Sequence, residues 1–363
     1  MKNYPAKYFL FFLPFIVALC LELFILPIHQ FTFRVWESLI VKRSFAILKG
    51  PFYPNMSVRK MEEGDLAYYT PCAIKKDVQW ITDQYGYRRA ITPDHRYPVV
   101  IIGDSNIAGS GLTQEELLSE ILQKKLGMAV YPLSPERINI IFDHILFKKF
   151  TPRIVILASI ERGIPTGLSK LRQKRIEKPS SWSKLLSVIQ LSSPLQHFGV
   201  LLDRTFKANM LNYLRARVNR AEPSLPEEID TSKCPLFFSH GQSTNQEATM
   251  ERYKLSIDKI KEYSDFFTSR GIRFIFLPLP NKETIHYEYL KTKKPEFLSR
   301  LIQKLQELNV EVIDTQKAFH EFYQETHTPL YQEDDTHWNA IGVKITAELL
   351  EKQIKTTPVP TSR

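Results

Sequence analysis

One serine of the sequence has neighbours that would suit a catalytic nucleophile. Ser105 lies in the tetrapeptide Gly-Asp-Ser-Asn, which directly follows a short apolar run ending at Gly103. A serine hydroxyl is a weak nucleophile until a neighbouring base accepts its proton. Gly-Asp-Ser also occurs in ordinary turns, so Ser105 needs a partner elsewhere in the chain before it can be given a role.

A histidine near the other end of the chain is the candidate partner. His337 lies in the hexapeptide Asp-Asp-Thr-His-Trp-Asn, just before the last expected helix. A carboxylate can hold one ring nitrogen of an imidazole while the other faces a serine. Asp335 and Asp334 both have suitable offsets, so the choice between them stays open. The alternative, a helix N-cap cluster with an incidental histidine, is weaker because Ser105 and His337 would flank one edge of the predicted sheet.

Alternating strand and helix patterns predict the scaffold that would bring these residues together. Short apolar runs indicate five strands, at 98–103, 129–133, 153–158, 272–277 and 310–314, of which the one at 129–133 is weak. Helical patterns lie between and after them, at 113–126, 138–150, 250–269, 297–308 and 339–354. This alternation predicts an α/β fold, a three-layer sandwich with a parallel five-stranded sheet. Such sheets bind ligands at the carboxyl ends of their strands.

The start of the chain is apolar enough to enter a membrane. Residues 8–28 are almost all apolar, with Glu22 as their charged exception, and about 20 such residues suit a bilayer crossing. An uncleaved anchor is favoured over a cleaved signal peptide or a buried core helix, because the run does not end in a small-residue cleavage site. Basic residues lie on both sides of the run, so the positive-inside rule gives no orientation.

The remaining chain divides by pattern. We expect an anchor at 1–30, a juxtamembrane and pre-domain segment at 31–97, a catalytic domain at 98–355 with a basic helical insertion at 163–250, and a tail at 356–363. Within the second segment, residues 31–48 resemble an interfacial helix and the rest is irregular.

The positive charge of the chain is concentrated in one segment. Between residues 163 and 220 there are eleven Lys and Arg against two acidic residues, so this segment carries +9 of the net +10. A local positive field attracts anionic glycans, lipid head groups or nucleic acid, and the alternative is a solvated helical face.

The cysteines leave two interpretations open: Cys72 and Cys234 either form a disulfide or remain two thiols. No spacing of Cys and His suggests a metal site, and no cofactor is expected.

Several short motifs occur together in the chain. They are Thr82 to Arg88, Gly103-Asp104-Ser105, Glu161-Arg162, Pro280-Asn281-Lys282, and Tyr331 followed by Asp335 to Asn339. These motifs resemble those of the SGNH hydrolase superfamily, with its flavodoxin-like sandwich. The closer resemblance is to its AlgX/AlgJ-like branch, which acetylates exported polysaccharides such as alginate. The resemblance implies that Ser105 carries the acyl group, that His337 is the general base and that Asp335 orients it.

The chain departs from the superfamily where the oxyanion donors should be. It lacks the usual glycine after the second strand, and Glu161-Arg162 stands in place of an asparagine after the third. Asn106 or Arg162 would then complete the oxyanion hole; Arg162 could instead pair with Asp83 or Glu161. The other predicted substrate contacts also have structural alternatives: Lys282 as a solvated cap, Trp338 as packing for the last helix, and an undecided role for Tyr331.

The implied activity is acyl transfer. An acetyl group would pass from a donor to Ser105 and then to a sugar hydroxyl, with the catalytic domain on the periplasmic or extracellular side of the cytoplasmic membrane. The implied partners are an exported, possibly anionic polysaccharide and a multispanning acyltransferase that supplies the acetyl group; nucleic acid is not expected. The alternatives are an acetylesterase with the same triad and a non-catalytic glycan-binding or scaffold protein.

Overall fold

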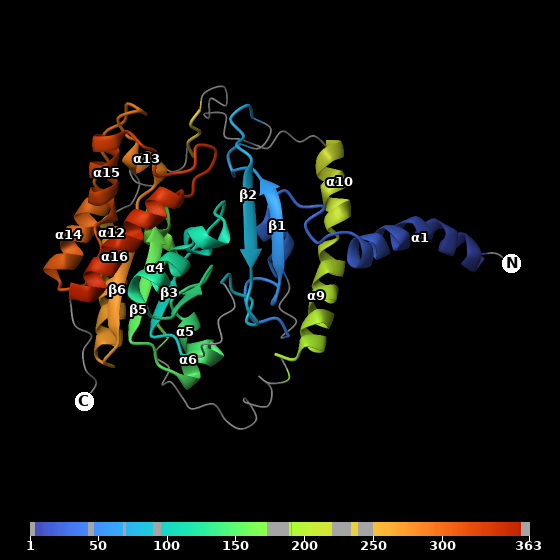
Figure 1. The fold of residues 1–363 in the computed structure, drawn as a ribbon, viewed down its shortest axis with the longest axis horizontal. Helices are drawn as coiled ribbons and strands as arrows, with labels where there is room; N and C mark the ends of the chain where they lie inside the picture. The colour runs from blue at the N-terminus through green and yellow to red at the C-terminus, as the bar shows by residue number, and fades with distance from the viewer. Residues whose placement is uncertain are drawn as a thin grey trace.

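A parallel sheet lies at the centre of the structure, a computed structural model that describes residues 4–42, 47–67, 70–89, 96–172, 189, 191–219, 234–238 and 250–356 (Figure 1). Its strand order is β4-β3-β5-β6. The bounds are β3 Val99–Ile102, β4 Val130–Leu133, β5 Ile154–Ile160 and β6 Arg273–Leu279. Each of the four strands falls within or close to a predicted run, so the α/β class with a parallel sheet is confirmed.

The predicted fifth strand is not confirmed. Residues 310–314 form only one parallel bridge to the edge of β6, between Val312 and Phe276. The run ends there because the Asp314 side chain accepts a hydrogen bond from the backbone N–H of Lys317, which caps the next helix. That helix, α15 (Thr315–Thr326), was not predicted.

Helices cover both faces of the sheet, as a three-layer sandwich requires. Alternate residues of β3 point to opposite sides: Val100 and Ile102 join one core, whereas Val99 and Ile101 join the other. The first core is closed by α5 (Ile140–Asp143), α6 (Ile145–Lys149), α12 (Met250–Thr268) and α14 (Phe297–Glu307). The second is closed by α4 (Leu118–Leu126), α15 and α16 (Ala340–Thr356).

The segment expected to be irregular contains a small second sheet. Strands β1 (Ser57–Glu62) and β2 (Lys76–Ile81) pair antiparallel. They share a core with α2 (Val35–Leu39), whose Val35 and Leu39 are fully buried. The prediction of an interfacial helix at 31–48 is therefore wrong for the described residues. The helix found there, α2, has five residues and packs inside the protein.

The N-terminal run forms one helix that is long and apolar enough to cross a membrane, Pro5–Ile25. It comprises α1 (Tyr4–Cys20) and a π-helical end, Leu21–Ile25. The described part of the predicted insertion is mainly helical, with α7 (Ile164–Gly167), α9 (Ser193–Lys207) and α10 (Asn209–Asn219). Residues 173–188, 190, 220–233 and 239–249 of that insertion, and 357–363 of the predicted tail, lie outside the described residues.

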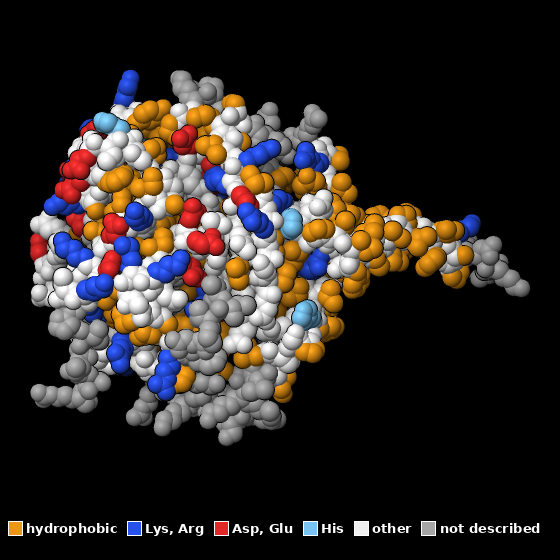
Figure 2. Space-filling model, in the orientation of Figure 1, with side chains coloured by type: hydrophobic (Ala, Val, Ile, Leu, Met, Phe, Trp, Pro, Cys, Tyr) orange, Lys and Arg blue, Asp and Glu red, His pale blue; other side chains and the backbone are white. Residues whose placement is uncertain are grey.

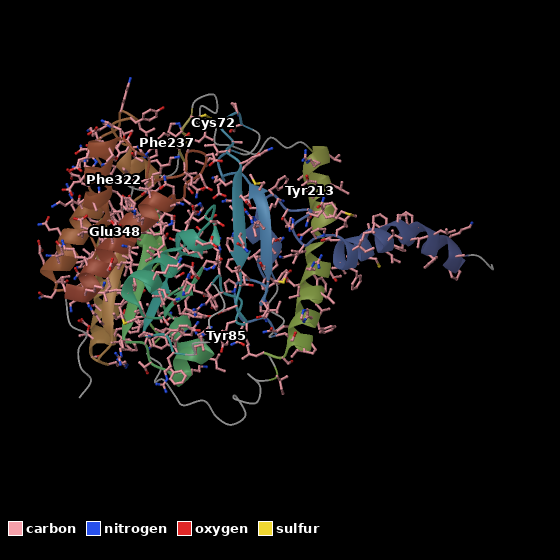
Figure 3. All side chains as sticks on the ribbon, in the orientation of Figure 1. Cys72, Tyr85, Tyr213, Phe237, Phe322 and Glu348 are labelled. Carbon is pink, nitrogen blue, oxygen red and sulfur yellow. A yellow bond between two sulfur atoms is a disulfide. The ribbon has the colours of Figure 1, made fainter. Side chains whose placement is uncertain are left out.

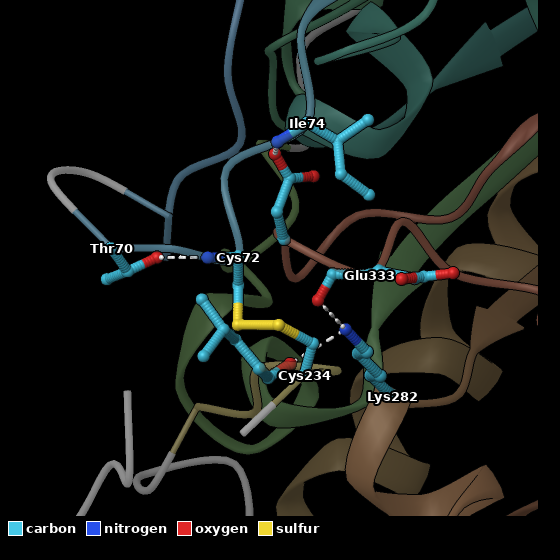
Figure 4. The surroundings of a disulfide bond; sticks show 8 residues. Thr70, Cys72, Ile74, Cys234, Lys282 and Glu333 are labelled. Atoms are coloured by element: carbon cyan, nitrogen blue, oxygen red, sulfur yellow. Dashed lines mark hydrogen bonds between the residues drawn. A yellow bond between two sulfur atoms is a disulfide. The ribbon is translucent and has the colours of Figure 1, made fainter. Parts of the chain in front are cut away.

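A disulfide joins two of the three cysteines. Cys72 and Cys234 are bonded, with their Cα atoms 5.6 Å apart. The bridge ties the loop between β1 and β2 to the short stretch 234–238, and Lys282 and Glu333 lie beside it (Figure 4).

Candidate active site

The turn after β3 places Ser105 at the carboxyl edge of the sheet. Ser105 is the first residue of the short helix α3 (Ser105–Ala108), and Asp104 is its N-cap. The Asp104 carboxylate accepts hydrogen bonds from the backbone N–H groups of Asn106 and Ile160, each at 2.9 Å. A side chain at Gly103 would collide with Ile107, since its Cβ would lie 2.4 Å from that residue. The turn is thus fixed to the end of β5.

Three predicted side chains form one continuous hydrogen-bonded relay. Ser105 Oγ lies 2.8 Å from His337 Nε2, and His337 Nδ1 lies 2.6 Å from Asp335 Oδ1. Asp335 and His337 are buried, while Ser105 is exposed at the surface. In this geometry the imidazole can take the serine proton while the carboxylate holds its other ring nitrogen.

The neighbouring aspartate has a different role. The Asp334 carboxylate accepts hydrogen bonds from Gly64 N at 2.8 Å and Ile74 N at 3.0 Å, and Lys76 Nζ lies 2.6 Å away. These contacts direct Asp334 toward the loop between β1 and β2. The choice that the sequence left open is therefore made by geometry: Asp335 is the partner of His337.

Two site residues have no signal in the sequence. Arg34, in the segment after the apolar helix, places Nη2 3.0 Å from Asp335 Oδ2 and 2.9 Å from Ser110 Oγ. It also forms an ion pair with Asp65. Asp65 Oδ2 in turn lies 3.4 Å from His337 Nδ1. Both residues are far from the motifs in sequence, so only the fold brings them to the relay.

The charge on Asp335 is stabilised by this setting. Burial alone would raise the pKa of its carboxyl group, but His337 and the Arg34 guanidinium outweigh burial and hold the pKa well below its usual range. Asp65, Asp335 and His337 are close enough to hold a cation. Arg34 already pairs with both carboxylates, however, so the cluster is arranged as a histidine–acid relay.

Two predicted contacts around Ser105 are corrected. The backbone N–H and the side-chain amide of Asn106 both donate to Asp104 Oδ1, at 2.9 and 3.2 Å, so Asn106 does not face an oxyanion. Trp338 is buried, and its Nε1 donates to the Asn106 carbonyl at 3.2 Å. Trp338 thus supports the turn that carries Ser105 and is not exposed for stacking on a sugar. Ser105 N–H itself has no hydrogen-bond partner among the described residues.

Lys282 and Tyr331 are buried supports. Lys282, at the start of α13 (Lys282–Ile285), is 1% exposed, and its ammonium lies within 3.2 Å of the carbonyls of Leu236, Gln332, Glu333 and Asp335. Burial lowers its pKa to about 8. The Tyr331 hydroxyl donates to the Pro280 carbonyl at 2.6 Å. Neither the solvated cap nor the substrate contact predicted for Lys282 agrees with this setting: Lys282 holds the loop that carries Asp335.

Arg162, another predicted substrate contact, lies at the site and its side chain is partly exposed. Its guanidinium lies 3.5 Å from Thr336 Oγ1, beside His337, and its backbone N–H donates to Asn281 Oδ1 at 3.3 Å. The alternative pair with Asp83 is not formed, because the Asp83 carboxylate accepts from the Tyr131 hydroxyl at 2.7 Å instead. Arg162 therefore remains available as a cationic group beside the relay.

Glu161, the residue before Arg162, is buried at the same edge of the sheet. Its carboxylate accepts from Asn281 N at 3.0 Å and from the Thr284 hydroxyl. Burial raises the pKa of Glu161 to about 7. The Glu-Arg pair thus joins the end of β5 to the turn after β6.

The comparisons with known proteins agree with this site in part. Residues 235–363 match the family model described as the SGNH hydrolase-like domain of acetyltransferase AlgX. This range contains Asp335 and His337 and leaves Ser105 outside it. Neither the curated proteins nor the solved structures give a significant match. The resemblance to the AlgX-like SGNH branch that the motifs predict is therefore confirmed over residues 235–363.

Proposed function

We propose that the protein is a serine-dependent O-acyltransferase that acetylates an exported polysaccharide. The observation that carries the proposal is the relay from Ser105 Oγ through His337 to Asp335, with distances of 2.8 and 2.6 Å. The family match supports an enzyme of the acetyltransferase or esterase type.

The first step would load the serine. His337 Nε2 accepts the Ser105 proton as Oγ attacks the carbonyl carbon of the acetyl donor, and a tetrahedral oxyanion forms. The intermediate collapses to acetyl-Ser105, and the leaving alcohol takes the proton from His337. The Ser105 N–H, which has no hydrogen-bond partner among the described residues, would donate to the oxyanion. One such donor is worth about 3 kcal/mol of transition-state stabilisation.

The second step would unload it. His337 takes the proton of a sugar hydroxyl, whose oxygen attacks the acetyl carbonyl, and Ser105 leaves with the proton returned to it. Water could replace the sugar in the same step, which would make the protein an esterase. The relay is identical in both cases, so the acceptor decides between them. The matched family is described as an acetyltransferase, which favours an acceptor other than water.

The compartment and partners belong to the same proposal. The apolar helix Pro5–Ile25 supports a single-pass anchor in the cytoplasmic membrane, and the Cys72–Cys234 disulfide supports a catalytic domain outside the cytoplasm. An acetyl group must then cross the membrane, which is the task that the sequence resemblance assigns to a multispanning acyltransferase. Arg162 beside the relay would suit an anionic acceptor.

The test is a partition experiment. The purified full chain is incubated with an acetyl-ester donor and an oligosaccharide, and mass spectrometry measures acetylated product against free acetate. We expect acetylated oligosaccharide from the wild type and neither product above background from Ser105→Ala. Free acetate alone from the wild type would favour the esterase, and full activity in Ser105→Ala would exclude the serine mechanism.

A further inference from the structure

Helix α9 has its polarity reversed relative to an ordinary surface helix. Its buried residues are Gln196, Gly199, Asp203 and Lys207, at helical spacing on the side that faces the body. Its outward side carries Phe198, Leu202 and Phe206, each one turn from the next, and Phe198 is 53% exposed. A soluble helix normally buries its apolar side. Here Val200 packs against the body, whereas Phe198 and Phe206 are more than half exposed.

Specific hydrogen bonds hold α9 in this orientation. Asp203 Oδ2 accepts from the Tyr53 hydroxyl at 2.7 Å, and Gln196 Nε2 donates to the Gln84 carbonyl at 2.9 Å. The buried Lys207 ammonium donates to the carbonyls of Glu37 and Ser38, both at 3.3 Å. Rotating α9 to bury its phenylalanines would break these bonds, so its apolar side is fixed outward.

Helix α10 continues the same apolar surface. Leu211, Leu214 and Val218 recur at three- and four-residue spacing and are all exposed, Val218 at 81%. Exposed Arg215 and Arg217 lie on either side of this stripe on the helix surface. Basic residues bordering an apolar stripe are typical of helices that lie in a membrane interface, since the long side chains reach the head groups.

Both helices are attached to the end of the apolar N-terminal helix. The Glu22 carboxylate accepts from Asn209 N at 2.9 Å and Met210 N at 3.0 Å, at the start of α10. The Arg204 guanidinium of α9 donates to the carbonyls of Leu23, at 3.1 Å, and Glu22. These contacts also explain why one acidic residue interrupts the apolar run.

The aromatic residues of the connecting segment strengthen the junction. The Tyr213 ring of α10, labelled near the base of α1 in Figure 3, lies 5.9 Å from Phe31 and 5.2 Å from Phe33. In Figure 1, α9 and α10 run one after the other across the base of α1, which projects away from the body. Figure 2 shows hydrophobic side chains continuing from α1 onto this edge of the molecule.

We propose that α9 and α10 lie in the membrane interface as a second contact with the lipid bilayer, beside the crossing made by α1. The bilayer surface must pass the level at which α1 leaves the body, and the outward apolar stripes of α9 and α10 lie at that level. Continuity with α1 and the bordering arginines select lipid as the occupant. The helices would sink about 5–10 Å into the boundary between head groups and acyl chains.

Spin labels on the full chain in lipid nanodiscs test this contact. In a Cys20→Ser background, Phe198→Cys or Leu214→Cys carries a nitroxide, and relaxation by oxygen, which enters lipid, is compared with relaxation by a water-soluble nickel complex. Matched controls are Tyr289→Cys and Leu255→Cys, which are 54% and 47% exposed, against 53% and 48% for the two test positions. All four positions are at the surface, and retention of the Cys72–Cys234 disulfide with an unchanged melting curve shows that each variant is folded.

We expect oxygen to relax the labels at 198 and 214 several-fold more than the nickel complex does, and the reverse at 289 and 255. Labels at 198 and 214 that behave like the controls would show that this face is in water and would overturn the proposal. Protection from both reagents would also overturn it, because a protein, such as a second copy of the chain, would then cover the face.

Discussion

At the scale of single residues, Asp335 and Asp334 show how neighbours in sequence acquire separate tasks. Asp335 points to His337 and is held charged by Arg34, whereas Asp334 accepts two backbone N–H groups and pairs with Lys76. The first contact orients the histidine of the proposed relay. The second fastens the loop between β1 and β2 to the loop that carries the histidine.

Paired substitutions separate these tasks. Asp335→Asn keeps the shape but removes the charge that stabilises the imidazolium, so kcat should fall by about 10³–10⁴-fold with the fold retained. Asp334→Asn should instead lower the free energy of unfolding by about 2 kcal/mol, because it weakens hydrogen bonds to a buried charged group. Urea unfolding and ester-hydrolysis rates on both variants check this. Equal effects of the two substitutions on kcat would contradict the division.

Arg34 is a positioning residue that acts through Asp335. Arg34→Met leaves Asp335 without its cation, so the pKa of that carboxyl group should rise. A lowered pKa stabilises the folded protein above the unfolded value of 3.8, and this contribution is lost as the pH falls below it toward the folded value. The variant should therefore be less stable at neutral pH and lose less additional stability on acidification. The unfolding free energy measured by urea at pH 7 and at about pH 2 tests the sign.

A control for Arg34 distinguishes positioning from simple packing. Arg34→Lys retains a cation near Asp335 and should recover part of both the stability and kcat that Arg34→Met loses. If Arg34→Lys and Arg34→Met behave identically in kcat and in their dependence on pH, the charge of Arg34 has no role at the relay.

At the scale of elements, the loop carrying Asp335 and His337 is held from several sides. Lys282 binds its carbonyls from α13, Leu236 N donates to the Glu333 carbonyl at 2.9 Å, and the disulfide fixes the neighbouring stretch. This arrangement keeps His337 within hydrogen-bonding distance of Ser105, which lies 232 positions away in the chain.

Loss of the disulfide should loosen that loop. Cys72→Ala with Cys234→Ala removes a bridge between residues separated by 162 positions, and the free energy of unfolding should fall by about 2–5 kcal/mol. Activity near the melting temperature should fall in parallel. Cys20→Ala, at an exposed cysteine in the apolar helix, is the matched control. A double variant as stable as this control would show that the bridge is dispensable.

His286, at the end of α13, gives the same region a dependence on pH. Burial, with Lys282 nearby, lowers its pKa to about 4, and its ring lies 4.4 Å from Tyr323. Between pH 6.5 and about pH 4, His286 is protonated in the unfolded chain but neutral in the folded protein. The free energy of unfolding therefore falls as the pH falls through this range. The loss attributable to His286 is about 3 kcal/mol.

Replacing this histidine by a non-titrating ring isolates the effect. His286→Phe should flatten the decline in the free energy of unfolding between pH 6.5 and 4, as measured by urea denaturation. An unchanged slope in the variant would assign the acid sensitivity to other groups.

At the scale of the whole molecule, the sequence predicts most of the parallel sheet and the three relay residues. Apolar runs are continuous at β3, β5 and β6, and the turns after strands meet at one edge of a parallel sheet, so Ser105 and His337 could be paired from the sequence. The fifth strand was overpredicted because the apolar pattern at 310–314 does not show that Asp314 caps a helix, which ends the extended segment.

Other parts of the site and fold required the tertiary structure. Arg34 reaches Asp335, and Asp65 reaches His337, because the segment before the sheet folds back over the loop that carries these two residues. No local sequence pattern predicts that contact. From the sequence, Asn106 was a candidate for the oxyanion hole, and Lys282 and Trp338 were candidate substrate contacts with a cap and helix packing as their alternatives. Burial and backbone partners, which the sequence does not show, decide between these roles. The reversed polarity of α9 was equally hidden, since its periodicity is that of any amphipathic helix.

The central claim is that Ser105 is an activated nucleophile, and covalent trapping tests it most directly. The full chain is treated with a fluorophosphonate, which labels serines whose hydroxyl is activated by a base, and the modified peptide is located by mass spectrometry. The relay predicts one modified residue, Ser105, with labelling lost in Ser105→Ala and strongly reduced in His337→Ala. Absence of label on Ser105 in the folded wild type, or equal labelling of the Ser105→Ala variant, would contradict the account.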